Sequence, residues 1–293
     1  MPPRDIRATF LDFAMLEPAP IRTLDARGLP LKLGGRTLVM GVINMTPDSF
    51  SDGGQYADAG AAVRAGLRMI EEGADIVDVG GESTRPGYVA VNADEEAKRT
   101  LPVIAGLVAR TDVPVSIDTY KAAVAEAALE QGARIINDVW GLQRDPDMAR
   151  VVAASGAAVV IMHNRERAEP NIDILDDIRA FFARSLERAR NAGIREDRIV
   201  LDPGIGFGKT LEQNLLILAR LDELHEFGFP LLLGTSRKSF IGRLAPSEPR
   251  ERLPGTLAAN VFAVLGRVTI LRVHDVAAHV QALRVAEAIR GAH

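Results

Sequence analysis

Short apolar runs alternate along the chain with longer amphipathic segments. About eight of these runs are almost wholly apolar, which is typical of strands buried on both faces. The segments between them carry apolar residues at helical spacing. The expected strands are Thr37–Ile43, Asp75–Val79, Val113–Ile117, Arg134–Ile136, Ala157–Ile161, Ile199–Leu201, Pro230–Leu233 and Val268–Val273. The expected helices are Ala59–Glu72, Glu95–Arg110, Lys121–Gln131, Pro146–Ser155, Ile174–Asn191, Leu211–Leu224, Thr256–Leu265 and Asp275–Ile289.

Strands that alternate with helices indicate an α/β fold built from parallel βαβ units. About eight units at this chain length favour a (β/α)₈ TIM barrel, with an open doubly wound sheet as the alternative. We therefore predict a single barrel domain over residues 37–293. Residues 1–36 precede the repeat, and we expect them to form a short N-terminal extension that caps the bottom of the barrel.

Composition narrows the class of protein. The 293 residues are 47% hydrophobic and carry a formal charge of −4, with a pI near 5.8, which speaks against a nucleic-acid binder. The chain has no cysteine, which excludes disulfides and thiolate metal sites and fits a reducing compartment. No apolar run approaches the roughly 20 residues of a membrane span, and no signal peptide is visible. We expect a cytoplasmic enzyme with no membrane partner.

Polar residues stand where the apolar runs end. In a barrel of this kind, the chemistry lies at the C-terminal ends of the strands. Carboxylate and amide oxygens at these strand ends accept hydrogen bonds and therefore suit a ring that is rich in N–H groups. Cationic side chains after the last two strands suit a phosphate. These residues are Asn44, Asp78, Asp118, Asn137, His163, Asp202, Lys238, Arg272 and His274. They predict a substrate with a polar heterocycle at one end and a phosphate at the other.

Several of these residues also have purely structural explanations. Asp202 can end a strand in a turn, and Asp118 can cap the following helix. His163 can be a buried histidine with satisfied hydrogen bonds, and Lys238 could instead form a Schiff base in an aldolase. His225 and His279 lie in helical patterns, and we expect both to face solvent.

The glycines of Gly204–Lys209 match neither nucleotide-binding motif. A P-loop needs glycine where this chain has Pro203, and a dinucleotide fingerprint needs its third glycine one residue later. Glycines at this spacing still let the backbone pass close to a flat ligand, and Phe207 is available for stacking.

The longer motifs resemble the dihydropteroate synthase family. Gly41–Gly54 (GVINMTPDSFSDGG) is similar to its first signature, and Asp78–Gly87 (DVGGESTRPG) is similar to its second. SIDT at 116–119, IIND at 135–138, DPGIGFGK at 202–209, SRK at 236–238 and RVHD at 272–275 follow in the family's order. After His163, however, the family commonly has a Met and a Gly-x-Pro-x-x-Met stretch, where this chain reads NRERAEP.

The resemblance implies an activity and a set of residues. The family condenses 6-hydroxymethyl-7,8-dihydropterin pyrophosphate with 4-aminobenzoate, giving 7,8-dihydropteroate and pyrophosphate for folate synthesis, with Mg²⁺ as cofactor. It implies Asp52, Arg85 and Lys238 as catalytic residues. The pterin would bind Asp118, Asn137, Asp202 and Lys238, and the pyrophosphate would bind Asn44, Arg272 and His274, with Asn44 on the metal. The aminobenzoate would bind Thr84, Arg85, Pro86, Phe207, Lys238 and Ser239.

Two alternative functions belong to the same fold. One is a non-catalytic pterin-binding paralogue, and the other is a methyltransferase that moves a methyl group from methyltetrahydrofolate to a corrinoid. The methyltransferase would need a cobalamin partner and has no use for Arg272 and His274 as pyrophosphate ligands. The family also suggests a homodimer formed through the last helices, with no partner beyond small-molecule substrates.

Overall fold

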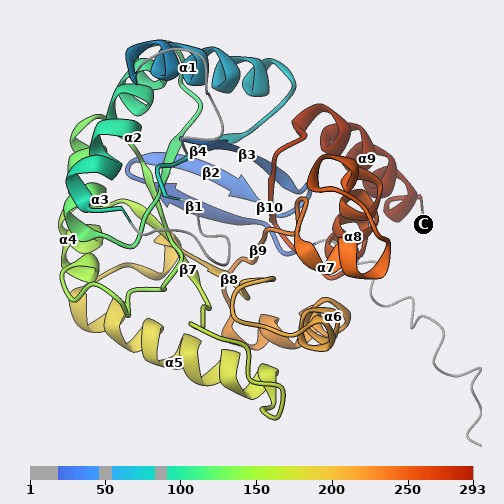
Figure 1. Cartoon of the computed structure of the whole chain (residues 1–293). Helices are drawn as coiled ribbons and strands as arrows, with labels where there is room; N and C mark the ends of the chain where they lie inside the picture. Colours follow the sequence, from blue (N-terminus) through green and yellow to red (C-terminus); the bar gives the residue numbers. More distant parts are fainter. Residues whose placement is uncertain (1–18, 46–54, 83–90, 293) are drawn as a thin grey trace, which may run out of the picture.

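The apolar runs form a barrel of eight parallel strands within the described residues of the computed structural model (Figure 1). The structure describes residues 19–45, 55–82 and 91–292. The barrel strands are β3 (Leu38–Asn44), β4 (Ile76–Gly80), β5 (Val115–Asp118), β6 (Ile135–Asp138), β7 (Ala158–Met162), β8 (Ile199–Asp202), β9 (Leu232–Leu233) and β10 (Ile270–Val273). They pair in the order β8-β7-β6-β5-β4-β3-β10-β9, and a parallel bridge between Leu201 and Leu231 joins the two ends. The expected barrel is confirmed.

Helices surround the strands on the outside of the barrel (Figure 1). They are α1 (Gln55–Glu71), α2 (Ala93–Val108), α3 (Ala122–Glu130), α4 (Met148–Ser155), α5 (Ile174–Ala192), α6 (Leu211–Ala219), α7 (Ser239–Leu244), α8 (Leu253–Leu265) and α9 (Val276–Arg290). The short helix α7 was not predicted, and the 3₁₀ helix η5 (Leu221–Phe227) replaces the second half of one expected helix. None of the helices among the described residues is long and apolar enough to span a membrane.

A β-hairpin packs against the N-terminal end of the barrel. Strands β1 (Arg22–Ala26) and β2 (Leu29–Leu33) pair antiparallel. Leu24 and Leu33 are buried in one apolar cluster with inward-facing residues of the barrel strands, such as Met40. The sequence pattern did not reveal these two strands, because they are short and carry polar residues on their outer face.

The two-residue period of the strands brings the polar residues into the barrel. Side chains two positions apart lie on the same face of a strand. On four strands an apolar residue of the interior cluster is followed, two positions later, by a polar one. These pairs are Ile76 and Asp78, Ile135 and Asn137, Val200 and Asp202, and Ile270 and Arg272. The interior is therefore apolar toward the hairpin and polar at the C-terminal ends of the strands.

The two helical histidines do not face solvent as expected. His279 on α9 is only 1% exposed, and its Nδ1 lies 2.6 Å from the carbonyl oxygen of Asp275. His225 on η5 is half-buried, with Nε2 at 2.9 Å from the carbonyl oxygen of Gly266. The expectation was wrong because each ring bonds through one nitrogen to a backbone carbonyl, and the helical pattern alone cannot reveal such a partner.

Candidate active site

A group of charged side chains fills the polar end of the barrel. The Arg272 guanidinium donates from Nε to Asp78 Oδ2 at 2.7 Å and from Nη2 to Asp118 Oδ2 at 2.5 Å. Asn137 Nδ2 donates to the same oxygen of Asp78 at 3.1 Å. These residues come from β10, β4, β5 and β6, so neighbouring strands place them together. Two carboxylates thus share one cation inside the barrel.

Several buried polar atoms of this group lack a partner. Asp78 Oδ1, Asn137 Oδ1 and Ser116 Oγ have no hydrogen bond within the described structure. Buried polar atoms are normally paired, so unpaired ones at the mouth of a barrel point to a ligand that supplies the missing groups. Asp78 and Asn137 in particular present acceptor oxygens to an N–H donor.

Burial also changes the acidity of Asp118. Loss of solvent raises its pKa to about 7, and the nearby carboxylate of Asp78 acts in the same direction, while Arg272 opposes both. A carboxylate with a raised pKa in a pocket is a common feature of functional sites. Asp118 thus changes its hydrogen-bonding character near neutral pH, from acceptor to donor and acceptor.

Asn44 and His274 lie beside each other at the same end. Asn44 Nδ2 is 3.4 Å from His274 Nε2, and His274 Nδ1 is 2.9 Å from Ser236 Oγ. The adjacent Arg237 binds Asp275 through Nε at 3.0 Å and Nη2 at 2.5 Å. Arg237 is thus already neutralised by a carboxylate.

The glycine motif forms a tight loop after β8. Asp202 Oδ1 accepts the backbone N–H of Gly204 at 2.7 Å, and Gly206 donates its N–H to Asn214 Oδ1 at 2.6 Å. Gly204 has φ +66°, and a Cβ there would lie 1.9 Å from the carbonyl oxygen of His163. Only glycine fits this close approach. Asp202 therefore binds its own loop as a turn residue while its carboxylate remains at the mouth.

Two lysines organise the same loop. Lys209 is buried, and its Nζ donates to the carbonyl oxygens of Gly204 at 2.7 Å and Phe207 at 3.0 Å. Lys238 donates from Nζ to the carbonyl oxygen of Ile205, and the same atom lies 4.3 Å from the centroid of the Phe207 ring. Burial lowers the pKa of Lys238 to about 8, which Asp202 partly offsets. The ammonium of Lys238 thus contacts both the carbonyl oxygen of Ile205 and the face of the Phe207 ring.

His163 has a structural environment. Its side chain is 1% exposed, its Nε2 lies 3.0 Å from Asp177 Oδ2, and its ring packs edge-on against Phe181 at 4.9 Å. Burial lowers its pKa to about 4, so the ring is neutral at physiological pH. Arg165 from the divergent loop also binds Asp177, at 2.7 Å. These contacts give His163 a structural environment, but its hydrogen bonds are not all satisfied, because the buried Nδ1 has no partner among the described residues.

The structure describes only some of the remaining predicted site residues. Ser239 opens α7 directly after Lys238 and is exposed. Glu82, at the end of a described segment, forms an ion pair with Lys121, which also pairs with the buried Glu96. The predicted residues Asp52, Thr84, Arg85 and Pro86 lie outside the described residues.

Sequence reasoning missed two residues with direct contacts to the site. Asp78 was named only as a strand end, and Lys209 was given no role. The two-residue spacing from Ile76 to Asp78 was the available signal for the first. Nothing in the pattern indicated that Lys209 folds back onto the carbonyls of its own loop.

The fold and this arrangement define a barrel enzyme that binds a polar ring and an anion, and comparisons with known proteins agree. The model of the family described as pterin binding enzyme matches residues 40–274. A dihydropteroate synthase of Clostridium beijerinckii is 47% identical over 258 residues, covering 88% of this chain and 96% of that protein.

Solved structures give the same result. The Clostridium difficile dihydropteroate synthase, crystallised in the presence of pteroic acid, has a TM-score of 0.85 at 50% identity, over 88% of this chain and 98% of that one. The Xanthomonas albilineans dihydropteroate synthase with 4-aminobenzoic acid has a TM-score of 0.89 at 45% identity, over 94% of this chain and all of that one.

The chain belongs to the pterin-binding enzyme family and, within it, to the dihydropteroate synthases. It is a transferase, and the family expected from the motifs is confirmed. The relatives support neither of the two alternatives, the corrinoid methyltransferase and the non-catalytic paralogue.

Proposed function

We propose that the polar end of the barrel carries out the dihydropteroate synthase reaction with the pterin at its centre. The observation that carries this proposal is the set of unpaired buried acceptors, Asp78 Oδ1 and Asn137 Oδ1, beside Asp118. A pterin ring edge offers N–H donors to such acceptors. Asp118, Asn137, Asp202 and Lys238 bind the ring, and the burial of these groups provides specificity, because a ligand without the donors leaves them unpaired.

The pyrophosphate group binds at the Asn44 side of the mouth. Arg272 supplies charge-assisted hydrogen bonds to its oxygens, and the His274 ring, which Ser236 orients, lies beside them. Arg272 forms ion pairs with Asp78 and Asp118. To bind the pyrophosphate, its guanidinium group must direct at least one N–H group to the anion while it keeps or breaks these ion pairs. Such sharing couples recognition of the ring to recognition of the leaving group.

A magnesium ion fits this side of the site. The described residues contain no cluster of three or more His, Asp or Glu side chains that could hold a metal ion. Mg²⁺ commonly binds one or two protein oxygens together with substrate phosphates. Asn44 directs its amide nitrogen to His274, which leaves the carbonyl oxygen as the metal ligand. When bound with the substrate, the ion neutralises charge on the departing pyrophosphate.

The aminobenzoate lies over Phe207. The ammonium of Lys238 lies above the same ring, and Ser239 follows at the start of α7, so a carboxylate meets a cation and a hydroxyl there. We also assign Thr84, Arg85 and Pro86 to this substrate, on the family resemblance alone. The X. albilineans relative was solved with 4-aminobenzoic acid, which supports the assignment of this substrate.

The reaction exchanges one bond for another. The C–O bond between the pterin methylene and pyrophosphate breaks, and its electron pair leaves with the pyrophosphate. The electron-rich ring stabilises the methylene cation, and the family resemblance assigns Asp52 to the same role. The neutral aniline nitrogen of aminobenzoate attacks the methylene carbon, and the proton that it loses passes to the departing pyrophosphate. The resemblance also assigns Arg85 to the exclusion of water that would trap the cation.

Asp118 tests the pterin assignment directly. We expect Asp118→Asn to weaken the binding of a pterin without pyrophosphate about tenfold or more, because one acceptor becomes a donor that faces an N–H. In the wild type, affinity falls as the pH drops from 8 to 6, because an acid with a pKa near 7 gains a proton over that range. We expect the affinity of Asp118→Asn for the pterin to stay constant over the same pH range. Isothermal titration calorimetry measures both effects.

An affinity of Asp118→Asn within about twofold of wild type, with the same pH dependence, contradicts the assignment and leaves Asp118 only as a partner of Arg272, since the N-cap of α3 is Lys121. Asp145→Asn is a useful control. Its carboxylate accepts the N–H of Ala122 next to the site, and no pterin contact is assigned to it.

We further propose a homodimer formed through the last helices, in the cytoplasm. Phe262 on α8 is 68% exposed, and Val285 and Ile289 on α9 are 57% and 68% exposed. These helices are neighbours on one side of the barrel (Figure 1). Exposed large apolar residues on adjacent helices are typical of a protein interface.

Phe262→Glu is expected to convert the dimer to a monomer in sedimentation velocity at micromolar concentration, because a buried carboxylate opposes association. Ile21→Glu places the same charge at an exposed apolar residue in the hairpin region and leaves the dimer intact. A dimer that persists in Phe262→Glu, or is lost equally in both variants, rules out this interface.

A further inference from the structure

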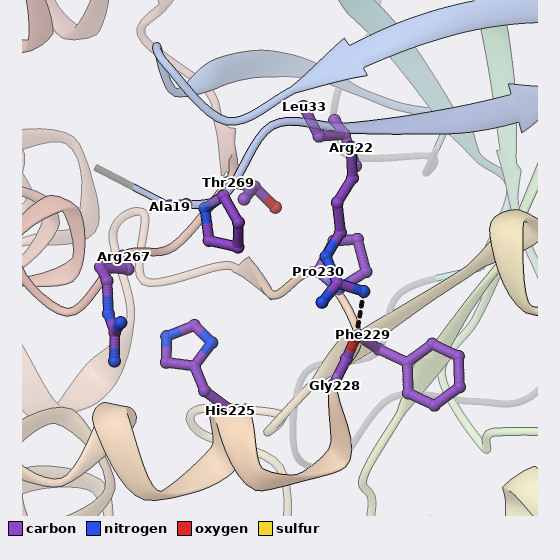
Figure 2. Close-up of a pocket in the computed structure, with 10 residues that line it drawn as sticks. Ala19, Arg22, Leu33, His225, Gly228, Phe229, Pro230, Arg267 and Thr269 are labelled. Carbon is purple, nitrogen blue, oxygen red and sulfur yellow. Dashed lines mark hydrogen bonds between the residues drawn. The ribbon is translucent and has the colours of Figure 1, made fainter. Parts of the chain in front are cut away.

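A second cavity lies at the opposite end of the barrel from the active site. It has a volume of about 210 Å³ and lies between the hairpin, η5 and the segments that lead into β9 and β10. Figure 2 shows Arg22, His225 and Arg267 among the residues that line it. Leu33, Phe229 and Pro230 form apolar walls. No role in the pterin reaction is assigned to any of these residues.

The charges around this cavity are unbalanced. None of the described residues that line it is acidic. Arg22 uses one nitrogen of its guanidinium to donate to the carbonyl oxygen of Gly228, which leaves its other N–H groups for a ligand (Figure 2). The Arg267 side chain makes no hydrogen bond or ion pair with any residue in the described part of the chain. Two arginines therefore line one partly enclosed space that no acidic residue of the described chain lines.

Arg267 is also held in an uncommon backbone conformation. Its φ is +58°, a left-handed value that costs a non-glycine residue on the order of 1 kcal/mol. The backbone N–H of Arg267 bonds to the carbonyl oxygen of Val264 at 3.0 Å in this turn. Glycine would relieve the strain, so the presence of arginine here is a reason to look for a function of its side chain.

The pKa of His225 responds to the same excess of positive charge. Burial lowers its pKa, and the nearby Arg267 and Arg22 lower it further, while its bond to Gly266 and the carboxylate of Asp222 act in the opposite direction. An anion bound between the two arginines would reverse the effect of their charges. The ring of His225 is therefore an internal probe of occupancy.

A neighbouring hollow provides a contrast. It shares Arg22, Phe229 and Pro230 with the first cavity and has a volume of about 670 Å³. Its lining also contains three carboxylates, those of Glu196, Asp197 and Glu226. Since these acids repel an anion, only the smaller cavity combines uncompensated cations with apolar walls.

We propose that the smaller cavity binds a small organic carboxylate with an apolar body. The carboxylate would accept hydrogen bonds from the guanidinium groups of Arg22 and Arg267, which suit two-oxygen recognition. The apolar part would contact Leu33, Phe229 and Pro230. A volume of 210 Å³ equals that of about seven liquid waters, which suits a single-ring or short-chain acid. Inorganic phosphate would gain nothing from the apolar walls.

The test is a titration with benzoate, followed by NMR of the full-length protein with isotopically labelled histidine. His225→Gln assigns the His225 signals, because one set disappears. We expect benzoate to shift the His225 imidazole resonances saturably and to raise the pKa of this ring. Benzamide, which has the same shape without the charge, is expected to cause no saturable shift. Following His225 separates this cavity from benzoate bound in the aminobenzoate site.

Arg267→Gly is the matched variant, because glycine suits the left-handed backbone while removing the guanidinium. We expect it to weaken benzoate binding at His225 at least tenfold, with Arg267→Lys between it and the wild type. Arg150→Gln removes an exposed arginine elsewhere on the surface and leaves binding unchanged.

Three results would overturn the proposal. They are no saturable shift at His225 with benzoate, unchanged affinity in Arg267→Gly, or phosphate binding as tightly as benzoate. Dihydropteroate synthesis by Arg267→Gly is expected to stay within about twofold of wild type. If benzoate does not bind at this cavity, the proposed active site is unaffected. If the enzyme does not make dihydropteroate, the proposal for this cavity is likewise unaffected.

Discussion

Lys238→Met is expected to lower kcat/KM for dihydropteroate formation by about 10²–10³, which is typical for the loss of one positioned charged donor at a reacting centre. Lys238 Nζ contacts the carbonyl oxygen of Ile205 and lies over the Phe207 ring, where both substrates meet in our assignment. A steady-state assay with both substrates varied measures the change.

Stability separates this effect from a loss of folding. Burial lowers the pKa of Lys238, so the charged group is held at a cost that methionine does not incur. We expect the free energy of unfolding of the variant to stay within about 1 kcal/mol of wild type in urea. Lys98→Met, at an exposed position on α2, is the control and keeps full activity. A kcat/KM for Lys238→Met within about fivefold of wild type contradicts the assignment.

Arg272→Met is expected to reduce both stability and turnover. The variant leaves Asp78 and Asp118 buried beside each other without the cation that they share. Removal of one partner from a buried ion pair costs about 3–5 kcal/mol, and we expect about 3 because the Arg272 side chain is 20% exposed. Arg150→Met breaks an exposed pair and costs less than about 0.5 kcal/mol.

The loss of stability in Arg272→Met depends on pH. Arg272 is the main group that lowers the pKa of Asp118, so without it this pKa rises further above the unfolded value near 3.8. The folded variant then binds more protons than the unfolded chain between pH 4 and at least 7, and its stability falls as the pH rises. Urea unfolding at pH 5.5 and 8 should show the larger loss at pH 8. Equal losses at both pH values would contradict the shared-cation arrangement.

The strands were predictable because they are apolar runs, but their ends were not. Several observed strands extend one residue beyond the predicted end, into a polar residue such as Asn44, Asp118 or Asp202. A hydrophobic pattern cannot predict where such a strand ends, because the last residue pairs with the neighbouring strand through its backbone. This pairing does not depend on whether its side chain is polar or apolar. Asn44, Asp118 and Asp202 are in fact the last residues of their strands, whereas Asp78, Asn137 and Arg272 lie one or two residues before the strand end.

Other features depend on contacts that are distant in sequence. The hairpin at residues 22–33 is stabilised by the barrel interior that Leu24 and Leu33 contact, so its own pattern is weak. The buried environment of His163 depends on Asp177 and Phe181 from α5. The sharing of Arg272 between Asp78 and Asp118 joins positions 194 and 154 residues apart. The local sequence pattern correctly placed His163, Asp118 and Arg272 at the C-terminal ends of the strands. It did not reveal which of their atoms form contacts.

Pyrophosphate release from 6-hydroxymethyl-7,8-dihydropterin pyrophosphate is the most direct test of the enzyme's activity. The assay compares reactions with and without 4-aminobenzoate, and with Mg²⁺ or with EDTA. We expect release that depends on Mg²⁺ and is accelerated by 4-aminobenzoate, with 7,8-dihydropteroate formed in equal amount. Tight pterin binding with no release and no dihydropteroate, even at saturating 4-aminobenzoate and Mg²⁺, would contradict the catalytic function.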